Sequence, residues 1–261
     1  MKAESPLIPT VIAVLTALVL VPQAQAMVIF SHDFSVGAAN LNGTPVDVGT
    51  GNWVAATVFS QNGNFGGNPG SATLAFTPQN GNLYSLDATL TGITGNGNWV
   101  AMGFANGQNP DANTANRFIN VNVLGTAWMF ARGDNSANPN EALLGLGAGT
   151  NGGVTSPQNF DGPLANANGG DLDLRILLDT RGGAGTWTAT WLAKRPTDAD
   201  YTVVRPTAPT LTESMNSVGF ALSNAGVSGT IESFSLSIVP EPSMGLLLAL
   251  GGLGFLGRRR R

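Results

Sequence analysis

Residues 171–192 read DLDLRILLDTRGGAGTWTATWL, and this stretch decides the fold class. In its first nine residues the apolar side chains occupy every second position, so they share one face of a β-strand. Its last seven residues alternate threonines with Trp187, Ala189 and Trp191. The glycine-rich segment between the two runs is typical of a turn. We therefore predict an antiparallel hairpin with one buried and one solvated face.

The same kind of short β-type run recurs over residues 27–238, whereas no stretch there has helical periodicity of any length. Together these runs predict an all-β fold, a two-sheet antiparallel sandwich that forms one domain over 27–238. The predicted strands are 28–34, 54–59, 72–76, 84–90, 100–104, 118–123, 127–130, 172–178, 186–192, 201–204, 217–222 and 230–238, with one more near 143–146.

Two short sequence patterns accompany the strands. Asn-Gly, whose residues tolerate the positive φ of tight hairpins, begins at Asn42, Asn62, Asn80, Asn96, Asn106, Asn151 and Asn168. The pentapeptide GNWVA occurs at 51–55 and again at 97–101. We expect the two copies to begin equivalent strands of one sandwich, with an internal duplication as the alternative.

The order of the strongest runs resembles the concanavalin A-like or laminin G-like jelly roll. The runs that carry the resemblance are the early FSHDF at 30–34, the hairpin at 172–194 and the closing strands at 218–222 and 231–238. The resemblance implies that the first and last strands pair, which would bring 30–34 beside 234–238. A pair of immunoglobulin-like sandwiches is the alternative fold.

Composition and charge exclude several classes of function. Hydrophobic residues make up 43% of the chain, enough for a core, and charged residues only 11%. Without Lys2, Glu4, Glu241 and the four terminal arginines, 7 basic and 14 acidic residues remain, a net charge of −7. Such a body lacks the basic surface that nucleic acid requires. The absence of cysteine excludes disulfides and thiolate chemistry.

Residues 1–26 have the pattern of a secretory signal peptide. Lys2 precedes the apolar run 11–21, and Ala24 and Ala26 place small residues where a signal peptidase binds them. We predict cleavage between Ala26 and Met27. The alternative is a retained membrane helix, but the run is short for a bilayer about 30 Å thick.

Residues 239–261 form a second targeting segment. Pro240 and Pro242 keep the segment that begins at Val239 extended, because proline fixes φ and restricts the preceding residue. The apolar stretch 244–256 that follows predicts a short hydrophobic helix of about 20 Å. Four arginines end the chain and would stop its transfer across the membrane: Arg258, Arg259, Arg260 and Arg261.

This tail resembles the PEP-CTERM sorting signal in its motif Val239-Pro240-Glu241-Pro242, its short apolar span and its terminal arginine cluster. The resemblance implies export, transient anchoring in the inner membrane, cleavage near Glu241 by an exosortase-type enzyme, and delivery to the cell surface or the extracellular space. A plain hydrophobic anchor after a chance pair of prolines is the alternative.

A catalytic site is not evident. A Ser-His-Asp triad would need His32, the one histidine, and Asp33 on the same strand cannot orient it because neighbouring side chains point to opposite faces. His32 is expected to be structural or at the surface. The Asp171 and Asp173 pair is accompanied by Arg175, which favours a solvated ladder of charges over a glycosidase site. We therefore predict a protein without catalytic activity.

A binding role has more support. Trp53, Trp99 and Trp128 could stack on sugars while loop asparagines donate hydrogen bonds, although tryptophans of a sandwich are often core residues. No cofactor or metal site is predicted. Calcium ligands could nevertheless come from two loop groups: Asp111, Asn113 and Asn116, or Asp134, Asn135 and Asn138.

The sequence thus predicts an exported, non-catalytic surface or matrix protein that binds polysaccharide. A secreted polysaccharide hydrolase with an unrecognised carboxylate site and a purely structural surface protein are the alternatives.

Overall fold

The structure is a computed structural model that describes residues 25–94, 99–108, 125–132, 143–148, 155–159, 171–205, 211, 215–222 and 226–240. Val28–Ile238 forms one compact unit. Its strands are β1 (Met27–His32), β2 (Val54–Ala55), β3 (Asn64–Gly66), β4 (Gly70–Ala75), β5 (Leu83–Thr94), β6 (Trp99–Ala105), β7 (Gly125–Arg132), β8 (Leu143–Ala148), β9 (Thr155–Asn159), β10 (Leu172–Asp179), β11 (Thr188–Lys194), β12 (Thr202–Arg205), β13 (Ser217–Leu222) and β14 (Ser228–Ile238).

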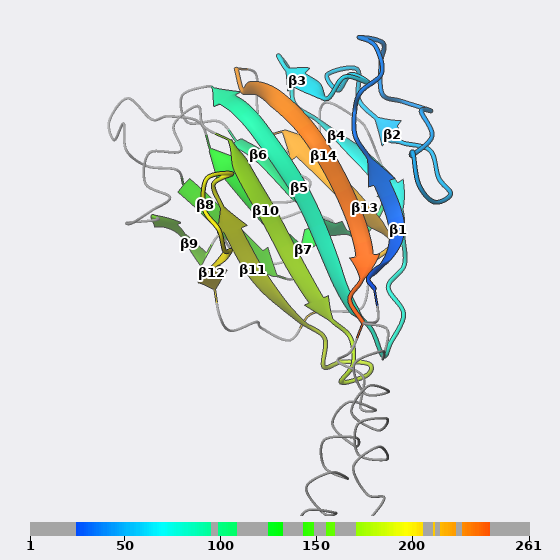
Figure 1. The fold of residues 1–261 in the computed structure, drawn as a ribbon, viewed down its shortest axis with the longest axis vertical. Coiled ribbons are helices and arrows are strands. Elements are labelled where there is room, and N and C mark those ends of the chain that lie inside the picture. Colours follow the sequence, from blue (N-terminus) through cyan, green and yellow to red (C-terminus); the bar gives the residue numbers. More distant parts are fainter. Residues whose placement is uncertain are drawn as a thin grey trace, which may run out of the picture. The chain divides into compact units, whose positions relative to one another are not determined.

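The strands form two antiparallel sheets. The first sheet has the order β1-β14-β5-β10-β11-β12, with β3 paired to β14, and it faces the viewer in Figure 1. The second sheet, with the order β2-β4-β13-β6-β7-β8-β9, lies behind it. The first strand of the chain therefore lies beside the last, as the resemblance implied. The predicted all-β jelly-roll sandwich is confirmed.

The predicted hairpin lies in the first sheet, between β5 and β12. β10 pairs with β11 in a regular antiparallel register, in which Ile176 faces Trp191 and Leu178 faces Ala189. Side chains alternate between buried and half-buried along both strands. The alternation of the sequence therefore predicted correctly which face of the hairpin is buried.

The main core fills the space between the two sheets. β10 contributes leucines and an isoleucine from one side, and β6 contributes Val100, Met102 and Phe104 from the other. An aromatic group extends the core toward the edge at β1 and β2, where the Trp53 ring lies 6.2 Å from Phe220 and 5.2 Å from Phe234. Burial of these large apolar side chains stabilises a sandwich that has no disulfides.

Three details of the strand prediction differ from the structure. The predicted strand 54–59 stops at Ala55, because the chain turns and Phe59 N donates to Ala56 O. The strands β3 and β9 were not predicted, since both are short and lack clear alternation. The predicted strand 118–123 lies outside the described residues.

Of the described Asn-Gly dipeptides, those at Asn42, Asn62 and Asn80 lie in turns and that at Asn106 begins in a bend, and none is the tight hairpin turn of which the pattern is typical. At Asn42, Asn62, Asn80 and Asn106 the following glycine has a positive φ, between 75° and 106°, while the asparagine does not. A type I′ hairpin turn needs both residues at positive φ. Asn80 lies between β4 and β5, which belong to different sheets. The other three Asn-Gly dipeptides lie outside the described residues.

The two GNWVA copies are not equivalent. Both lie at the start of strands of the second sheet, but β2 is an edge strand and β6 is central. Trp53 packs in the main core, whereas Trp99 packs on the opposite face of the sheet. The same pentapeptide therefore presents its tryptophan to two different environments.

Both predicted targeting segments lie largely beyond the described residues. Of the residues at the predicted signal-peptide cleavage site, Ala26 and Met27 are described and exposed, while Ala24 is outside. Val239 and Pro240 are described and half-buried; the rest of the tail, with Glu241, Pro242 and the four arginines, is outside. Within the described part of the chain, no helix is long and apolar enough to cross a membrane.

Candidate functional site

A second apolar cluster lies on the face of the second sheet that points away from the main core. On β6, Val100, Met102 and Phe104 enter the main core, so the intervening residues face the other way. We call the cluster on that face the second-sheet platform. It consists of Trp99, Ala101, Ala105, Trp128, Phe130 and Ala221.

Three aromatic rings follow one another across the platform. The rings of Trp99 and Phe130 lie 5.6 Å apart at an angle of 34°, and those of Phe130 and Trp128 lie 6.0 Å apart at 14°. Trp128 and Phe130 are buried, with 1% and 6% of their surface exposed, whereas Trp99 is half-buried. Trp99 is thus the aromatic member that solvent reaches.

Small residues form the floor beside these rings. One row across the sheet runs from Thr73 on β4 through Gly219 on β13 and Gly103 on β6 to Trp128 on β7. The next row runs from Ser71 through two alanines to Phe130. The strands approach one another closely here, because a Cβ on Gly103 would lie 2.4 Å from Ala127 O.

A buried hydroxyl lies at the far end of the glycine row. Thr73 is 3% exposed, and its Oγ1 makes no hydrogen bond to any residue that the structure describes. A buried hydroxyl that forms no hydrogen bond costs free energy, of the order of 1–3 kcal/mol. Ser217, on the same face of neighbouring β13, instead donates to Gly107 O at 2.7 Å. Thr73 Oγ1 is therefore a buried hydroxyl on this face whose hydrogen-bonding capacity is unused among the described residues.

The structure separates the three tryptophans that the sequence proposed for binding. Trp99 and Trp128 come together on the platform. Trp53 is 1% exposed in the main core, where rings from both sheets surround it, so it presents no surface to a ligand. Trp187 and Trp191 are also main-core residues.

Sequence reasoning missed Phe130 and Thr73 as members of the site. Phe130 follows Trp128 at a spacing of two, which does place both on one face of a strand. Thr73 lies on a strand whose two faces are both buried, so alternation could not reveal its orientation. Only the pairing of β4 with β13 places Thr73 in the row that ends at Trp128.

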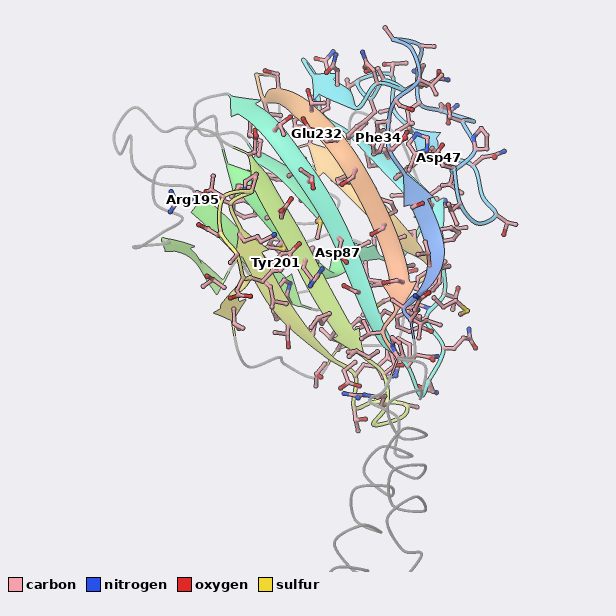
Figure 2. The ribbon with its side chains drawn as sticks, in the orientation of Figure 1. Phe34, Asp47, Asp87, Arg195, Tyr201 and Glu232 are labelled. Carbon is pink, nitrogen blue, oxygen red and sulfur yellow. The ribbon has the colours of Figure 1, made fainter. Side chains whose placement is uncertain are left out.

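The outer face of the first sheet carries a compact set of charges. Arg175 pairs with Asp87, and the Lys194 Nζ lies 3.5 Å from Asp173 Oδ2. The Arg175 guanidinium lies 4.1 Å from the centre of the Tyr201 ring. Figure 2 shows Tyr201 and Asp87 on this face. The predicted ladder of charges around Asp173 and Arg175 is thus present and consists of paired groups.

Burial raises the pKa of the Tyr201 hydroxyl to about 12, with Asp87 and Asp173 adding to the rise and Arg175 opposing it. Tyr201 is therefore a neutral phenol at ordinary pH. It covers cations that already have carboxylate partners, which is the arrangement of a structural contact and not of an acid or base.

His32 is buried at the end of β1. It is 3% exposed, and neither ring nitrogen makes a hydrogen bond within the described part of the chain. The Phe34 ring lies 4.5 Å away in an edge-on arrangement. Burial lowers the pKa of His32, and the carboxylates of Asp47 and Asp33 oppose this shift. Asp47 Oδ1 lies 3.5 Å from His32 Nδ1. Phe34 and Asp47 lie beside β1 in Figure 2. The expectation of a structural histidine fits this position.

No cluster of three histidine, aspartate or glutamate side chains that could hold a metal occurs among the residues that the structure describes. The six residues proposed as calcium ligands, from Asp111 to Asn138, lie outside those residues. Calcium binding by these loops therefore stays a prediction.

The chain after β14 matches a known sorting signal. Residues 239–261 match the PEP-CTERM protein-sorting motif. The chain carries a PEP-CTERM tail. The tail implies export, a C-terminal sorting step and processing by an exosortase, as its motif and arginine cluster predicted. The match begins at Val239, directly after β14 ends at Ile238.

Several solved structures are similar in fold to this chain. The VIP36 exoplasmic/lumenal domain in its Ca²⁺/Man-bound form gives a TM-score of 0.47 with 10% identity, covering 84% of this chain and 94% of that one. Lectin II from Ulex europaeus gives 0.45 with 13% identity, covering 84% and 100%. The metal-free Emp46p carbohydrate recognition domain gives 0.45 with 16% identity, covering 70% and 87%. No curated protein is significantly similar to the chain in sequence.

Proposed function

We propose that the chain is an exported, non-catalytic protein that binds polysaccharide through the second-sheet platform and is released from the membrane by cleavage of its PEP-CTERM tail. The observation that carries the binding proposal is the aromatic series from Trp99 through Phe130 to Trp128 on the face opposite the main core. Aromatic rings stack on the apolar faces of sugars, and Trp99 is the ring of this series that solvent reaches.

Trp99 is the contact residue of the proposed site. It is half-buried, so part of its ring is open to a sugar, while Phe130 and Trp128 hold its neighbourhood in place. Thr73, three strands from Trp128 along the glycine row, is 3% exposed, so the proposed contact with a sugar rests on Trp99.

The chemistry of the described residues supports binding over hydrolysis. The charged side chains of the first sheet's outer face are paired with one another, and the platform itself consists of apolar residues. Hydrolysis of a glycosidic bond requires two carboxyl groups about 5 to 10 Å apart on either side of the bond.

The binding proposal is tested with the mature, secreted protein on a panel of polysaccharides, including the exopolysaccharide of the producing bacterium, with and without Ca²⁺. We expect Trp99→Ala to weaken binding about tenfold, since aromatic stacking contributes about 0.5–1.5 kcal/mol beyond burial. The matched control is Val203→Ala, which removes an exposed apolar side chain from β12 of the other sheet. Equal loss in both variants, or no retention on any polysaccharide, would contradict the proposal, and product release from a polysaccharide would instead favour the hydrolase.

The sorting proposal is tested separately by intact-mass measurement of the protein extracted from the cell surface or the medium. We expect a mature form that begins at Met27 and has lost Arg258 to Arg261. A surface form that keeps the four arginines would show that the tail is a permanent anchor.

A further inference from the structure

The Asn-Gly dipeptides have no part in the binding or sorting proposals, but they are sites of spontaneous deamidation. In this reaction the glycine N loses its proton and attacks the asparagine Cγ, and the side-chain amide leaves as ammonia. Water then opens the resulting succinimide to aspartate or isoaspartate. Glycine favours the attack because it has no side chain to obstruct it. Four such sites are described: Asn42, Asn62, Asn80 and Asn106.

Two contacts can block this reaction in a folded protein. A hydrogen bond from the glycine N–H to a fixed acceptor keeps the proton on the nitrogen and fixes the peptide plane. A hydrogen bond to the asparagine Oδ1 holds the side-chain amide away from that nitrogen.

The fold provides both contacts at Asn42. Gly43 N donates to Trp53 O at 2.7 Å, and Asn42 Oδ1 accepts from Ala55 N at 3.1 Å. Both acceptor and donor are backbone groups beside β2, so their positions are fixed.

The same arrangement occurs at the next site along the chain. Gly63 N donates to Ser60 O at 2.9 Å. Asn62 Oδ1 accepts from Ser60 Oγ at 2.6 Å and from Asn64 N at 3.3 Å.

Asn80 and Gly81 are held by two residues of the distant turn between β10 and β11. Gly81 N donates to Thr180 O at 3.0 Å, and Asn80 Oδ1 accepts from Trp187 Nε1 at 2.7 Å. These contacts join the loop between β4 and β5 to the hairpin of β10 and β11. Deamidation here requires that both contacts open.

Asn106 differs from the other three sites in both respects. Gly107 N donates to the side chain of Asn216, which is an exposed residue, and not to a backbone carbonyl. Within the part of the chain that the structure describes, no hydrogen bond holds the Asn106 side chain. Its amide is therefore free to turn toward Gly107 N whenever the Asn216 side chain moves.

We propose that, of the four described Asn-Gly sites, Asn106 is the one at which the native protein deamidates, and that the fold protects the other three. The reaction places a new carboxylate at the end of β6. Isoaspartate also lengthens the backbone there and shifts Gly107 O, which accepts the Ser217 hydroxyl hydrogen bond at 2.7 Å. The modification therefore alters the end of the sheet face that carries the platform.

The test uses the mature protein, incubated at pH 8.5 and 37 °C and sampled over days, in native buffer and in urea. Chymotrypsin cleaves after aromatic residues, so Trp53, Phe65 and Phe104 place the four asparagines in separate peptides. Mass spectrometry gives the rate at each site, and fragment spectra distinguish Asn106 from the asparagines that follow it. In the native protein we expect Asn106 to react at least about fivefold faster than each other site, the factor that one hydrogen bond contributes. In urea the four rates should converge.

Two variants separate the contacts. Asn216→Ala removes the acceptor of Gly107 N and should accelerate deamidation at Asn106 about fivefold without changing the other three sites. Trp187→Phe removes the donor to Asn80 and should accelerate that site alone. Equal native rates at all four sites would overturn the proposal, and so would a rate at Asn106 that Asn216→Ala leaves unchanged.

Discussion

Gly43 and Gly63 provide a matched pair of substitutions, because both follow an asparagine and both have nearly the same φ, 78° and 75°. An alanine at either position adopts a left-handed conformation that costs about 1–2 kcal/mol. Alanine also leaves the unfolded chain fewer conformations than glycine does, which offsets about 0.5 kcal/mol of this cost. Backbone strain alone therefore predicts the same loss, about 1 kcal/mol, for Gly43→Ala and Gly63→Ala.

The surroundings of the two glycines differ. A Cβ at Gly43 meets no atom within 4 Å, whereas a Cβ at Gly63 would lie 1.9 Å from Ile231 O and 3.2 Å from the Phe34 Cβ. The backbone at Gly63 would have to retreat by more than about 1 Å to reach an ordinary C···O distance. That movement pulls on the 2.9 Å hydrogen bond from Ile231 N to Gly63 O.

We therefore expect the free energy of unfolding to fall by about 1 kcal/mol in Gly43→Ala and by about 3–5 kcal/mol in Gly63→Ala. The difference combines overpacking, about 1–3 kcal/mol, with one weakened hydrogen bond, about 1 kcal/mol. Equilibrium urea unfolding of the secreted protein, followed by tryptophan fluorescence, measures both values. Losses that agree within about 1 kcal/mol would refute the steric reasoning and leave backbone strain as the whole effect.

Two further predictions concern titrating groups. Since burial lowers the pKa of His32 below its ordinary value of 6.5, the unfolded chain binds a proton there more readily than the folded chain. The part of the free energy of unfolding that depends on this histidine is therefore highest above pH 6.5. It falls as the pH drops from 6.5 toward the folded pKa, by at most about 1.4 kcal/mol per pH unit. Urea unfolding between pH 7 and 5 should show this slope in the wild type and a smaller one in His32→Gln; equal slopes would contradict it. For Tyr201, ultraviolet titration should show ionisation at about pH 12, absent in Tyr201→Phe, and Asp87→Asn should lower that pKa because the Asp87 carboxylate helps to raise it; a Tyr201 that ionises near pH 10 would contradict both.

Alternation in the sequence determined most of the first sheet. In β10 and in the last part of β14, residues 234–238, every second residue is apolar, and burial follows that pattern through Leu174, Ile176, Phe234 and Leu236. A strand with one solvated face must alternate, so its sequence reveals which face is buried.

For the strands of the second sheet, the same physical reason explains why the sequence does not show which face meets the main core. Every residue of β13 is buried, and so is every residue of β6 except the half-buried Trp99, so burial does not alternate along either strand. Apart from Trp99, small residues occupy one face and mostly larger ones the other. The sequence suggested Trp99 and Trp128 as binding residues because of their type, but it could not separate them from Trp53. Only the pairing of strands assigns Trp53 to the main core and the other two to the platform.

The sequence alone determined the fold class, the buried face of the β10 and β11 hairpin and the sorting tail. Each depends on the order of residues along a short segment, which local geometry turns directly into structure. Tertiary structure decided which tryptophans share a face, which Asn-Gly dipeptide lacks a second hydrogen bond, and why Gly63 differs from Gly43. These properties depend on contacts between residues far apart in the chain, such as Gly63 with Ile231 and Asn80 with Trp187. Identical short sequences therefore acquired different roles only when the strands came together.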